Sequence, residues 1–294
     1  MRNTLVSKLI EFAKKDKDVI LLVGDLGFGC FEPFAKEFPT RFVNCGIAEQ
    51  NMMSVAAGMA KLNKKVFVYS IATFSTLRCI EQIRNDVAYH DLPITIITVG
   101  AGLEYSSMGM SHHATEDLSV VRALPNVAIY SPANVQSCAQ CLDQIYKNGK
   151  PAYIRLNKSG CDSIYDKCNS IDIDKVLDGK DIAILSMGTI LDQAYQAGKI
   201  IGASVYSISK IKPLNQKAIA KELSKYKKVI TLEEHNKTGG FGSAVCELVC
   251  DNNINVQVKR FAIEDIYTHQ VGKRDYLRKF YGIDKDAIID YCKK

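Results

Sequence analysis

Residues that could do chemistry stand in a few short polar segments of the chain. Glu49 follows a Cys45-Gly46 turn at the expected start of a helix, where an acidic residue often serves only to complement the helix dipole. His112 and His113 are adjacent in a Gly- and Ser-rich loop, and imidazole can donate or accept a proton near neutral pH. Neighbours in sequence rarely point at one ion, so contacts to a substrate are favoured over a metal site.

Arg155 and Lys158 place two cations at the end of an expected buried strand. Guanidinium and ammonium groups suit phosphate oxygens, so both side chains are candidate anchors for an anionic substrate. The formal net charge of +6, from 38 basic and 32 acidic residues, is compatible with such substrates. Lys-rich patches such as residues 225–228 are typical of solvated helix faces, and we expect no nucleic-acid binding.

Alternating strands and helices must position these side chains. Beyond an opening helix at 5–13, the apolar runs predict strands at 19–23, 41–45, 65–70, 94–99, 127–131 and 152–156, with helices at 48–62, 76–89, 117–123 and 135–148. A second series has strands at 182–186, 204–207, 228–233 and 256–260, with helices at 192–201, 216–223 and 242–252. This pattern predicts an α/β protein with two doubly wound domains.

The larger, mostly parallel domain is expected at 1–160 and the smaller one at 181–294, with a polar linker at 161–180. Parallel sheets bind ligands beyond the carboxyl ends of their strands, where the Gly-, Ser- and His-rich loops lie. The 10 cysteines show no disulfide-framework spacing, and Cys138-x-x-Cys141 is a poor zinc site, so we expect buried, reduced thiols in a cytoplasmic protein. No signal segment or long apolar run indicates export or a membrane.

Residues 46–50, Gly-Ile-Ala-Glu-Gln, resemble the pyrimidine-binding segment of the transketolase family. The resemblance implies that Glu49 hydrogen-bonds a nitrogen of the aminopyrimidine ring of thiamine diphosphate, which favours the imino form of the ring and activates the cofactor. It also places Ile47 and Asp25 near the cofactor, although Asp25 could equally cap a turn. Phe74 matches the aromatic residue that packs on the pyrimidine.

Residues 109–118 resemble the Gly-x-Thr-His-Gln segment of the same family. The resemblance implies that His112 faces the thiazolium and donates to the substrate oxygen, with His113 in place of the usual Gln. Met108 stands where the family has an Asp that contacts the donor sugar's hydroxyls, and Gly100 replaces a phosphate-facing His.

Substrate recognition follows from the same comparison. Arg155 and Lys158 match basic residues that hold the substrate's phosphate in the family. Because Met108 and Gly100 depart from the family pattern, the donor and acceptor sugars, and whether they are phosphorylated, stay open.

The resemblance covers essentially the whole chain, but only the second and third of the three transketolase domains. The diphosphate-binding Gly-Asp-Gly and Asn pattern, which holds Mg²⁺, has only a superficial echo in Gly24-Asp25-Leu26 and Asn44. The resemblance therefore implies the C-terminal (beta) subunit of a split transketolase that moves a two-carbon ketol unit between sugars. A partner N-terminal subunit would hold the diphosphate and Mg²⁺, in a dimer of heterodimers.

Other functions stay open at this stage. The alternatives are a deoxyxylulose-phosphate-synthase-like subunit, a beta-type subunit of a 2-oxo-acid dehydrogenase and a non-catalytic paralogue. The Gly-rich turn at 239–242 follows an acidic pair and departs from the dinucleotide-binding spacing, so we interpret it as structural.

Overall fold

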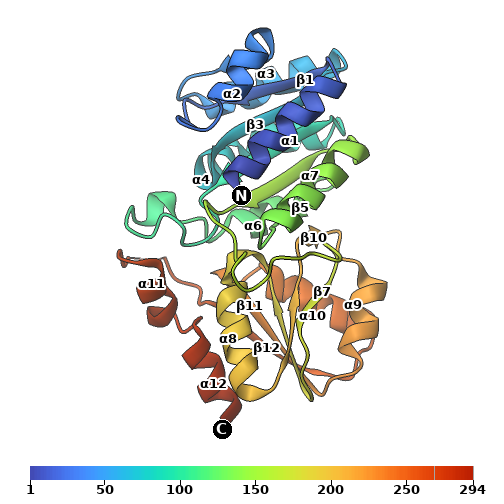
Figure 1. The fold of residues 1–294 in the computed structure, drawn as a ribbon, viewed down its shortest axis with the longest axis vertical. Coiled ribbons are helices and arrows are strands. Elements are labelled where there is room, and N and C mark those ends of the chain that lie inside the picture. The colour runs from blue at the N-terminus through green and yellow to red at the C-terminus, as the bar shows by residue number, and fades with distance from the viewer. Residues whose placement is uncertain (268, 294) are drawn as a thin grey trace.

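The computed structural model describes residues 1–267 and 269–293, and these residues form two sheets that lie one beyond the other along the long axis (Figure 1). The first sheet has seven strands in the order β10-β5-β6-β4-β3-β1-β2. Its strands are β1 (Val19–Val23), β2 (Phe42–Asn44), β3 (Lys65–Ile71), β4 (Ile94–Val99), β5 (Ala128–Tyr130), β6 (Ala152–Leu156) and β10 (Lys210–Lys212). All pairs are parallel except β10 with β5, so the carboxyl ends of β1 to β6 share one edge.

Helices cover both faces of this sheet because both faces are apolar. One core packs α1 (Arg2–Lys15), α2 (Glu32–Glu37) and α7 (Val135–Asn148) on the sheet, with the rings of Phe12 and Tyr146 stacked at 4.2 Å. The other core packs α3 (Glu49–Lys61) and α6 (Asp117–Arg122), together with the segment from β3 to β4. This arrangement confirms the predicted α/β class with a mostly parallel sheet.

The second sheet has five strands in the order β12-β11-β8-β9-β7. Its strands are β7 (Asp174–Leu177), β8 (Ile182–Ser186), β9 (Ser204–Ser207), β11 (Lys228–Asn236) and β12 (Gln257–Ile263). The helices around it are α8 (Leu191–Ile201), α9 (Gln216–Leu223), α10 (Phe241–Asp251), α11 (Arg274–Phe280) and α12 (Lys285–Lys293). In Figure 1, α11 and α12 run along the outer side of this domain.

Several parts of the fold differ from the sequence-based expectation, which also did not include α2, α11 and α12. The predicted linker at 161–180 contains β7, which pairs antiparallel with β9 at the edge of the second sheet. The strand β10 returns from the second half of the chain to pair with β5 in the first sheet. Both strands are short, and three or four residues cannot show a strand periodicity.

The single helix expected at 76–89 is interrupted. The structure has α4 (Ala72–Ser75), a 3₁₀ turn at Leu77–Cys79, α5 (Ile80–Gln82) and a π-helical turn at Ile83–Ala88. The hydroxyls of Ser75 and Thr76 donate back to the carbonyls of Ile71 and Ala72, and such bonds compete with a regular helix.

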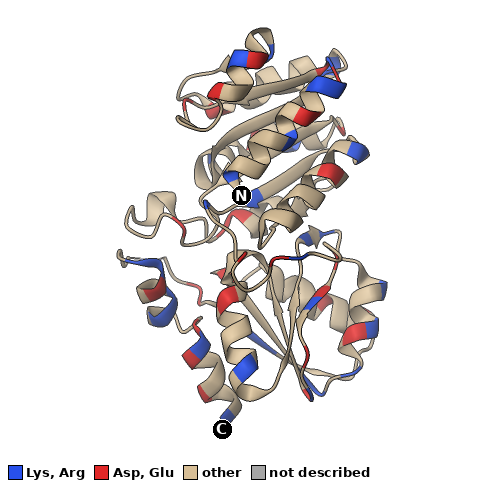
Figure 2. Ribbon diagram, in the orientation of Figure 1, with Lys and Arg blue, Asp and Glu red and all other residues tan. Residues whose placement is uncertain are grey.

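Charged residues of both signs alternate along the outer helices of both domains (Figure 2). This mixing agrees with the interpretation of the Lys-rich patches as solvated faces. Within the described ranges, none of the helices combines the length and the apolar character needed to cross a membrane.

The contact between the domains is tight at Gly102, which gives a testable prediction. Gly102 has φ +58°, and an ideal Cβ there would lie 2.5 Å from Cβ of Glu234 and 2.8 Å from its carbonyl oxygen. Gly149 has the same φ of +58° but no neighbour within 4 Å. Gly149→Ala should therefore cost about 1 kcal/mol of unfolding free energy from backbone strain alone.

Gly102→Ala should cost about 1–3 kcal/mol more, because the added methyl group overpacks the domain interface. Urea unfolding of both variants measures the difference. Equal losses for the two variants would contradict a close packing of the domains at this point.

Candidate functional site

The carboxylate of Glu49 lies at the carboxyl edge of the first sheet and is 1% exposed. It is the first residue of α3, which follows β2 after a short turn. The Ser70 hydroxyl donates to Oε1 at 3.0 Å, and the Arg78 guanidinium donates to Oε2 at 2.7 Å. A carboxylate can accept about four hydrogen bonds, so both oxygens keep capacity for a further donor.

Gly24, at the end of β1, closes one side of this acid. An ideal Cβ on Gly24 would lie 3.3 Å from Cγ of Glu49 and 3.4 Å from Oγ of Ser70, so a side chain there would crowd both. Nearby, burial and the charge of Glu49 raise the pKa of the Cys79 thiol to about 12. The thiol therefore stays protonated at neutral pH and does not act as a competing nucleophile.

Arg78 joins Glu49 to an aromatic cluster. Its guanidinium carbon lies 4.5 Å from the centre of the Phe74 ring, and the Phe74 and His112 rings meet at 5.2 Å with an interplanar angle of 65°. The Thr73 hydroxyl donates to the carbonyl of Ser111 at 2.9 Å, which ties the His112 loop to α4. The structure thus brings Glu49, Phe74 and His112 together from the ends of β2, β3 and β4.

Asp25 and Ile47 lie on the neighbouring loops of the same edge. Asp25 accepts a hydrogen bond from the Asn44 amide at 2.9 Å, and the Asn44 side-chain oxygen accepts one from the Gly46 amide at 2.9 Å. Ile47 is 78% exposed. The large side chains of Phe28 and Met108, on the loops that follow β1 and β4, are also exposed.

Lys158 approaches the cluster through Tyr105. Its ammonium lies 4.6 Å from the centre of the Tyr105 ring, and the Tyr105 and His112 rings are 6.0 Å apart. An ideal Cβ on Gly100 would lie 2.5 Å from that tyrosine ring. Tyr105 therefore fills the space beside Gly100, which the resemblance had assigned to a phosphate-facing histidine.

Arg155 requires a correction. The sequence analysis expected it to anchor a substrate, but its side chain is 2% exposed. Its Nε lies 3.1 Å from a carboxylate oxygen of Asp117, and it donates to the carbonyl of Ala114 at 3.0 Å. Asp117 is also buried and accepts from the Tyr153 hydroxyl, so this guanidinium belongs to a buried ion pair, where it also contacts Met187 of the second domain.

His113 is buried and supports the loop. Its Nε2 lies 3.2 Å from the carbonyl of Ser106, and burial lowers the pKa of the ring. The ring is therefore neutral at pH 7 and can donate this hydrogen bond.

Sequence reasoning missed Ser70, Arg78 and Tyr105. Phe74 and Arg78 stand four positions apart, a separation at which residues meet on a helical turn, but the helix was expected only from 76 and the chain between them is irregular. Ser70 and Tyr105 showed no comparable pattern.

The Gly-rich turn before α10 is structural, in agreement with the interpretation from the sequence. Glu233 accepts hydrogen bonds from the amides of Phe241 and Gly242 at 2.6 and 2.8 Å. The amides that could have bound an anion at this helix start are thus occupied by a side chain of the protein.

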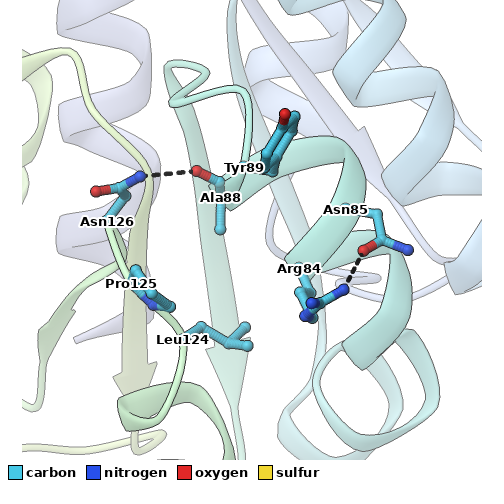
Figure 3. A pocket seen from close by; sticks show the side chains of 7 residues that line it. All are labelled: Arg84, Asn85, Ala88, Tyr89, Leu124, Pro125 and Asn126. Carbon is cyan, nitrogen blue, oxygen red and sulfur yellow. Dashed lines mark hydrogen bonds between the residues drawn. The ribbon is translucent and has the colours of Figure 1, made fainter.

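Two further features help to delimit the site. A pocket of about 660 Å³ lies between the π-helical turn and the loop after α6, where the Asn126 amide donates to the carbonyl of Ala88 (Figure 3). None of Glu49, Phe74 and His112 lines it. Among the described residues, no group of three or more His, Cys, Asp and Glu side chains could hold a metal ion.

Comparison with known proteins agrees with this geometry. Residues 1–162 match the pyrimidine-binding domain of transketolase, and residues 172–288 match the transketolase C-terminal domain. A putative transketolase C-terminal section from Methanocaldococcus jannaschii is 35% identical over 299 residues, covering 98% of this chain and 93% of the relative. One of the subunits of an apulose-4-phosphate transketolase from Phocaeicola vulgatus is 32% identical over 312 residues, covering 100% and 97% of the two chains.

A solved structure shows the same arrangement of both domains. It is described as a split gene transketolase, inactive beta4 tetramer, and matches with a TM-score of 0.89 at 30% identity, covering 99% of this chain and 96% of that chain. The present chain belongs to the transketolase family, of which it contains the pyrimidine-binding and C-terminal domains.

Proposed function

We propose that this chain is the C-terminal subunit of a split transketolase, which transfers a two-carbon ketol unit between sugar substrates together with a partner subunit. The observation that carries the proposal is the buried Glu49 carboxylate, connected through Arg78 and Phe74 to His112 at the sheet edge. Similar chains support it, since one is named as a transketolase subunit and another as an inactive beta4 tetramer. The proposal requires that such a subunit is inactive without its partner.

The residues at the edge fit the aminopyrimidine of thiamine diphosphate, on which the transketolase family depends. Glu49 offers a buried acceptor with spare capacity, Phe74 offers an apolar ring, and Gly24 leaves room beside the acid. When bound, thiamine diphosphate supplies the nucleophilic carbon that carries the two-carbon unit. We infer that the partner holds Mg²⁺ and the diphosphate, since the two domains matched here are the pyrimidine-binding and C-terminal ones.

Ser70 and Arg78 fix the two oxygens of Glu49, and this fixes the direction from which the carboxylate accepts a further hydrogen bond. In a site closed to water, such a carboxylate holds a proton on the ring nitrogen better than an exposed one would. Arg78 pairs with the carboxylate while its own plane packs on Phe74. Acid and aromatic platform therefore act as one unit.

His112 and Lys158 are proposed to contact the sugar. The Nδ1 atom of His112 lies 3.0 Å from the Ser111 hydroxyl, which fixes the ring and leaves its other nitrogen for a substrate oxygen. Lys158, exposed above Tyr105, would meet an acidic group at the distal end of the sugar. Met108 is exposed on the loop that carries His112. Its thioether side chain offers a sugar hydroxyl no carboxylate, so we expect Met108 to change which donor sugars are accepted.

The exposed apolar side chains indicate where a partner would cover the site. Phe28, Ile47 and Met108 are exposed on the loops that follow β1, β2 and β4, at the same edge of the sheet as Glu49, and large exposed apolar groups of this kind mark interfaces. We infer a dimer of heterodimers in which the cofactor is enclosed between subunits. All ten cysteines are free, which supports a reducing, cytoplasmic compartment.

The link between Glu49 and Arg78 can be tested on the chain alone. Arg78→Met should lower the unfolding free energy by about 1–2 kcal/mol, because it leaves a buried carboxylate with one donor fewer; partial exposure of Arg78 limits the loss. In a Glu49→Gln background the same change should cost less than about 0.5 kcal/mol. Urea unfolding of the four proteins measures this coupling, and additive losses would contradict it.

The proposed function is tested by calorimetric binding of thiamine diphosphate with MgCl₂. We expect no measurable binding to this chain alone, binding once a candidate N-terminal transketolase subunit from the same genome is added, and ketol transfer by that mixture. Omission of MgCl₂ should abolish the binding. Equal binding by the chain alone would contradict the need for a partner, and a mixture that binds the cofactor but transfers no ketol unit would contradict the transferase assignment.

A further inference from the structure

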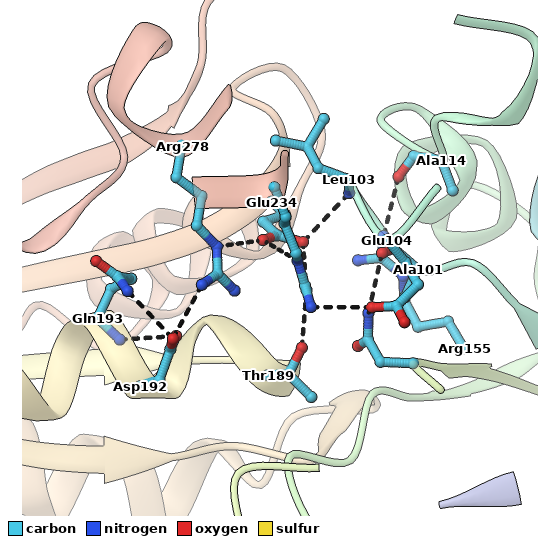
Figure 4. Close-up of polar contacts among 12 residues, drawn as sticks. Ala101, Leu103, Glu104, Ala114, Arg155, Thr189, Asp192, Gln193, Glu234 and Arg278 are labelled. Atoms are coloured by element: carbon cyan, nitrogen blue, oxygen red, sulfur yellow. Dashed lines mark hydrogen bonds and ion pairs between the residues drawn. The ribbon is translucent and has the colours of Figure 1, made fainter. Parts of the chain in front are cut away.

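Arg274, the first residue of α11, connects the C-terminal domain to the loops of the first domain. Figure 4 shows Leu103 of the first domain facing Glu234 of the second. Its Nε and one terminal nitrogen donate to the two oxygens of Glu234 at 2.8 and 2.6 Å. Its other terminal nitrogen donates to Glu104 at 2.9 Å. This bidentate geometry fixes the guanidinium plane, so Glu104 and Glu234 are held at a defined separation.

Glu234 stays charged over the whole range in which the protein would work. Burial acts to raise the pKa of this carboxyl, but the charges and hydrogen bonds of Arg274 and Arg278 outweigh it and lower the pKa to about 2. The ion pair between Glu234 and Arg274 therefore persists at neutral pH.

Both acids that Arg274 bridges, Glu104 and Glu234, hold backbone that leads to the proposed substrate site. Glu104 accepts one hydrogen bond from the side-chain amide of Asn157 at 2.9 Å and another from the backbone amide of Lys158 at 3.1 Å. Glu234 accepts from the backbone amide of Leu103 at 3.2 Å. Glu104 thus binds the segment that carries Lys158, and Glu234 binds the start of the loop at 103–113. This loop carries Met108 and His112.

The segment before α11 supports the same loop at a second point. The Gly272 amide donates to the carbonyl of Ser106 at 3.3 Å, and this carbonyl also lies 3.2 Å from Nε2 of His113. Figure 1 shows the loop at 103–113 beside the chain that enters α11. The C-terminal domain therefore contacts the substrate loop at two points, through Glu234 and through Gly272.

We propose that Arg274 is a positioning residue for the transfer reaction. Through it the C-terminal domain holds Lys158 and the His112 loop in fixed positions relative to each other. The inference rests on the proposed function for its catalytic meaning, but the contacts that it invokes lie within this chain. Without Arg274 the loop and the Lys158 segment lose their common anchor, while Glu49, Ser70 and Arg78 keep their own contacts. Substrate binding should weaken and cofactor activation should persist.

A matched control is available on the same domain interface. Arg122 on α6 donates to both oxygens of Glu247 on α10 at 2.7 and 2.6 Å, and its side chain is about as buried as that of Arg274. Its contacts lie away from the substrate loop. Arg122→Met therefore removes a cross-domain arginine–carboxylate pair of the same chemistry, with an acid, Glu247, that is 57% exposed where Glu104 and Glu234 are 11% and 5% exposed.

Hydrogen–deuterium exchange of the chain alone tests the positioning role without reference to activity. Arg274→Met should speed exchange of the backbone amides at 103–113 and 158 by about tenfold, whereas Arg122→Met should leave them within about twofold of the unsubstituted protein. Glu104→Gln, which preserves the side-chain volume, should speed exchange at the same amides. It replaces Arg274→Met as the test if Arg274→Met folds poorly. Unchanged exchange in these segments would overturn the proposal.

Steady-state kinetics of the complex with its partner test the catalytic consequence. We expect Arg274→Met to raise KM for the donor sugar about tenfold with kcat within about twofold, and the calorimetric affinity for thiamine diphosphate to be unchanged. A KM equal to that of Arg122→Met would overturn the positioning role. An inactive unsubstituted complex would instead contradict the proposed function, and the exchange experiment would still decide the role of the bridge.

Discussion

The buried negative charge of Glu49 is the constraint on which the rest of the site depends. A carboxylate removed from water is costly unless hydrogen-bond donors replace its hydration. Ser70 at the end of β3 and Arg78 in the 3₁₀ turn that follows α4 supply those donors. Gly24 has no side chain that would crowd the acid. Since Arg78 also packs on Phe74, the interrupted segment after β3 places a charge partner and an aromatic platform around one acid.

The two domains divide the work. In the proposed function the first domain would provide the groups that face the cofactor, since Glu49, Phe74 and His112 lie at the shared carboxyl edge of β1 to β4. The second domain contributes to the site indirectly, by holding the loop that carries His112 through Glu234 and Arg274. The start of this loop is thus fixed by a buried ion pair of the second domain, while Met108 farther along the loop stays exposed.

Local sequence pattern predicted most of the strands, and the resemblance to the transketolase family singled out Glu49, which the structure buries. It could not reveal contacts between distant residues: Arg78 meets Glu49 across 29 positions, and Arg274 meets Glu104 across 170. Arg155 shows the limit most clearly. Its place at a strand end suggested a ligand, yet its side chain turns inward to a buried carboxylate. The edge strands β7 and β10 are too short for a recognisable period.

The most direct test of the role of Glu49 is the rate at which the reactive carbon of bound thiamine diphosphate exchanges its proton for deuterium. In the complex with the partner subunit, Glu49→Gln should slow this exchange by about 10²–10⁴-fold, because the amide cannot hold the ring proton as the carboxylate does. Glu81→Gln, an exposed acid on α5, should leave the rate unchanged. Exchange in Glu49→Gln at the unsubstituted rate would contradict the conclusion that this buried carboxylate activates the cofactor.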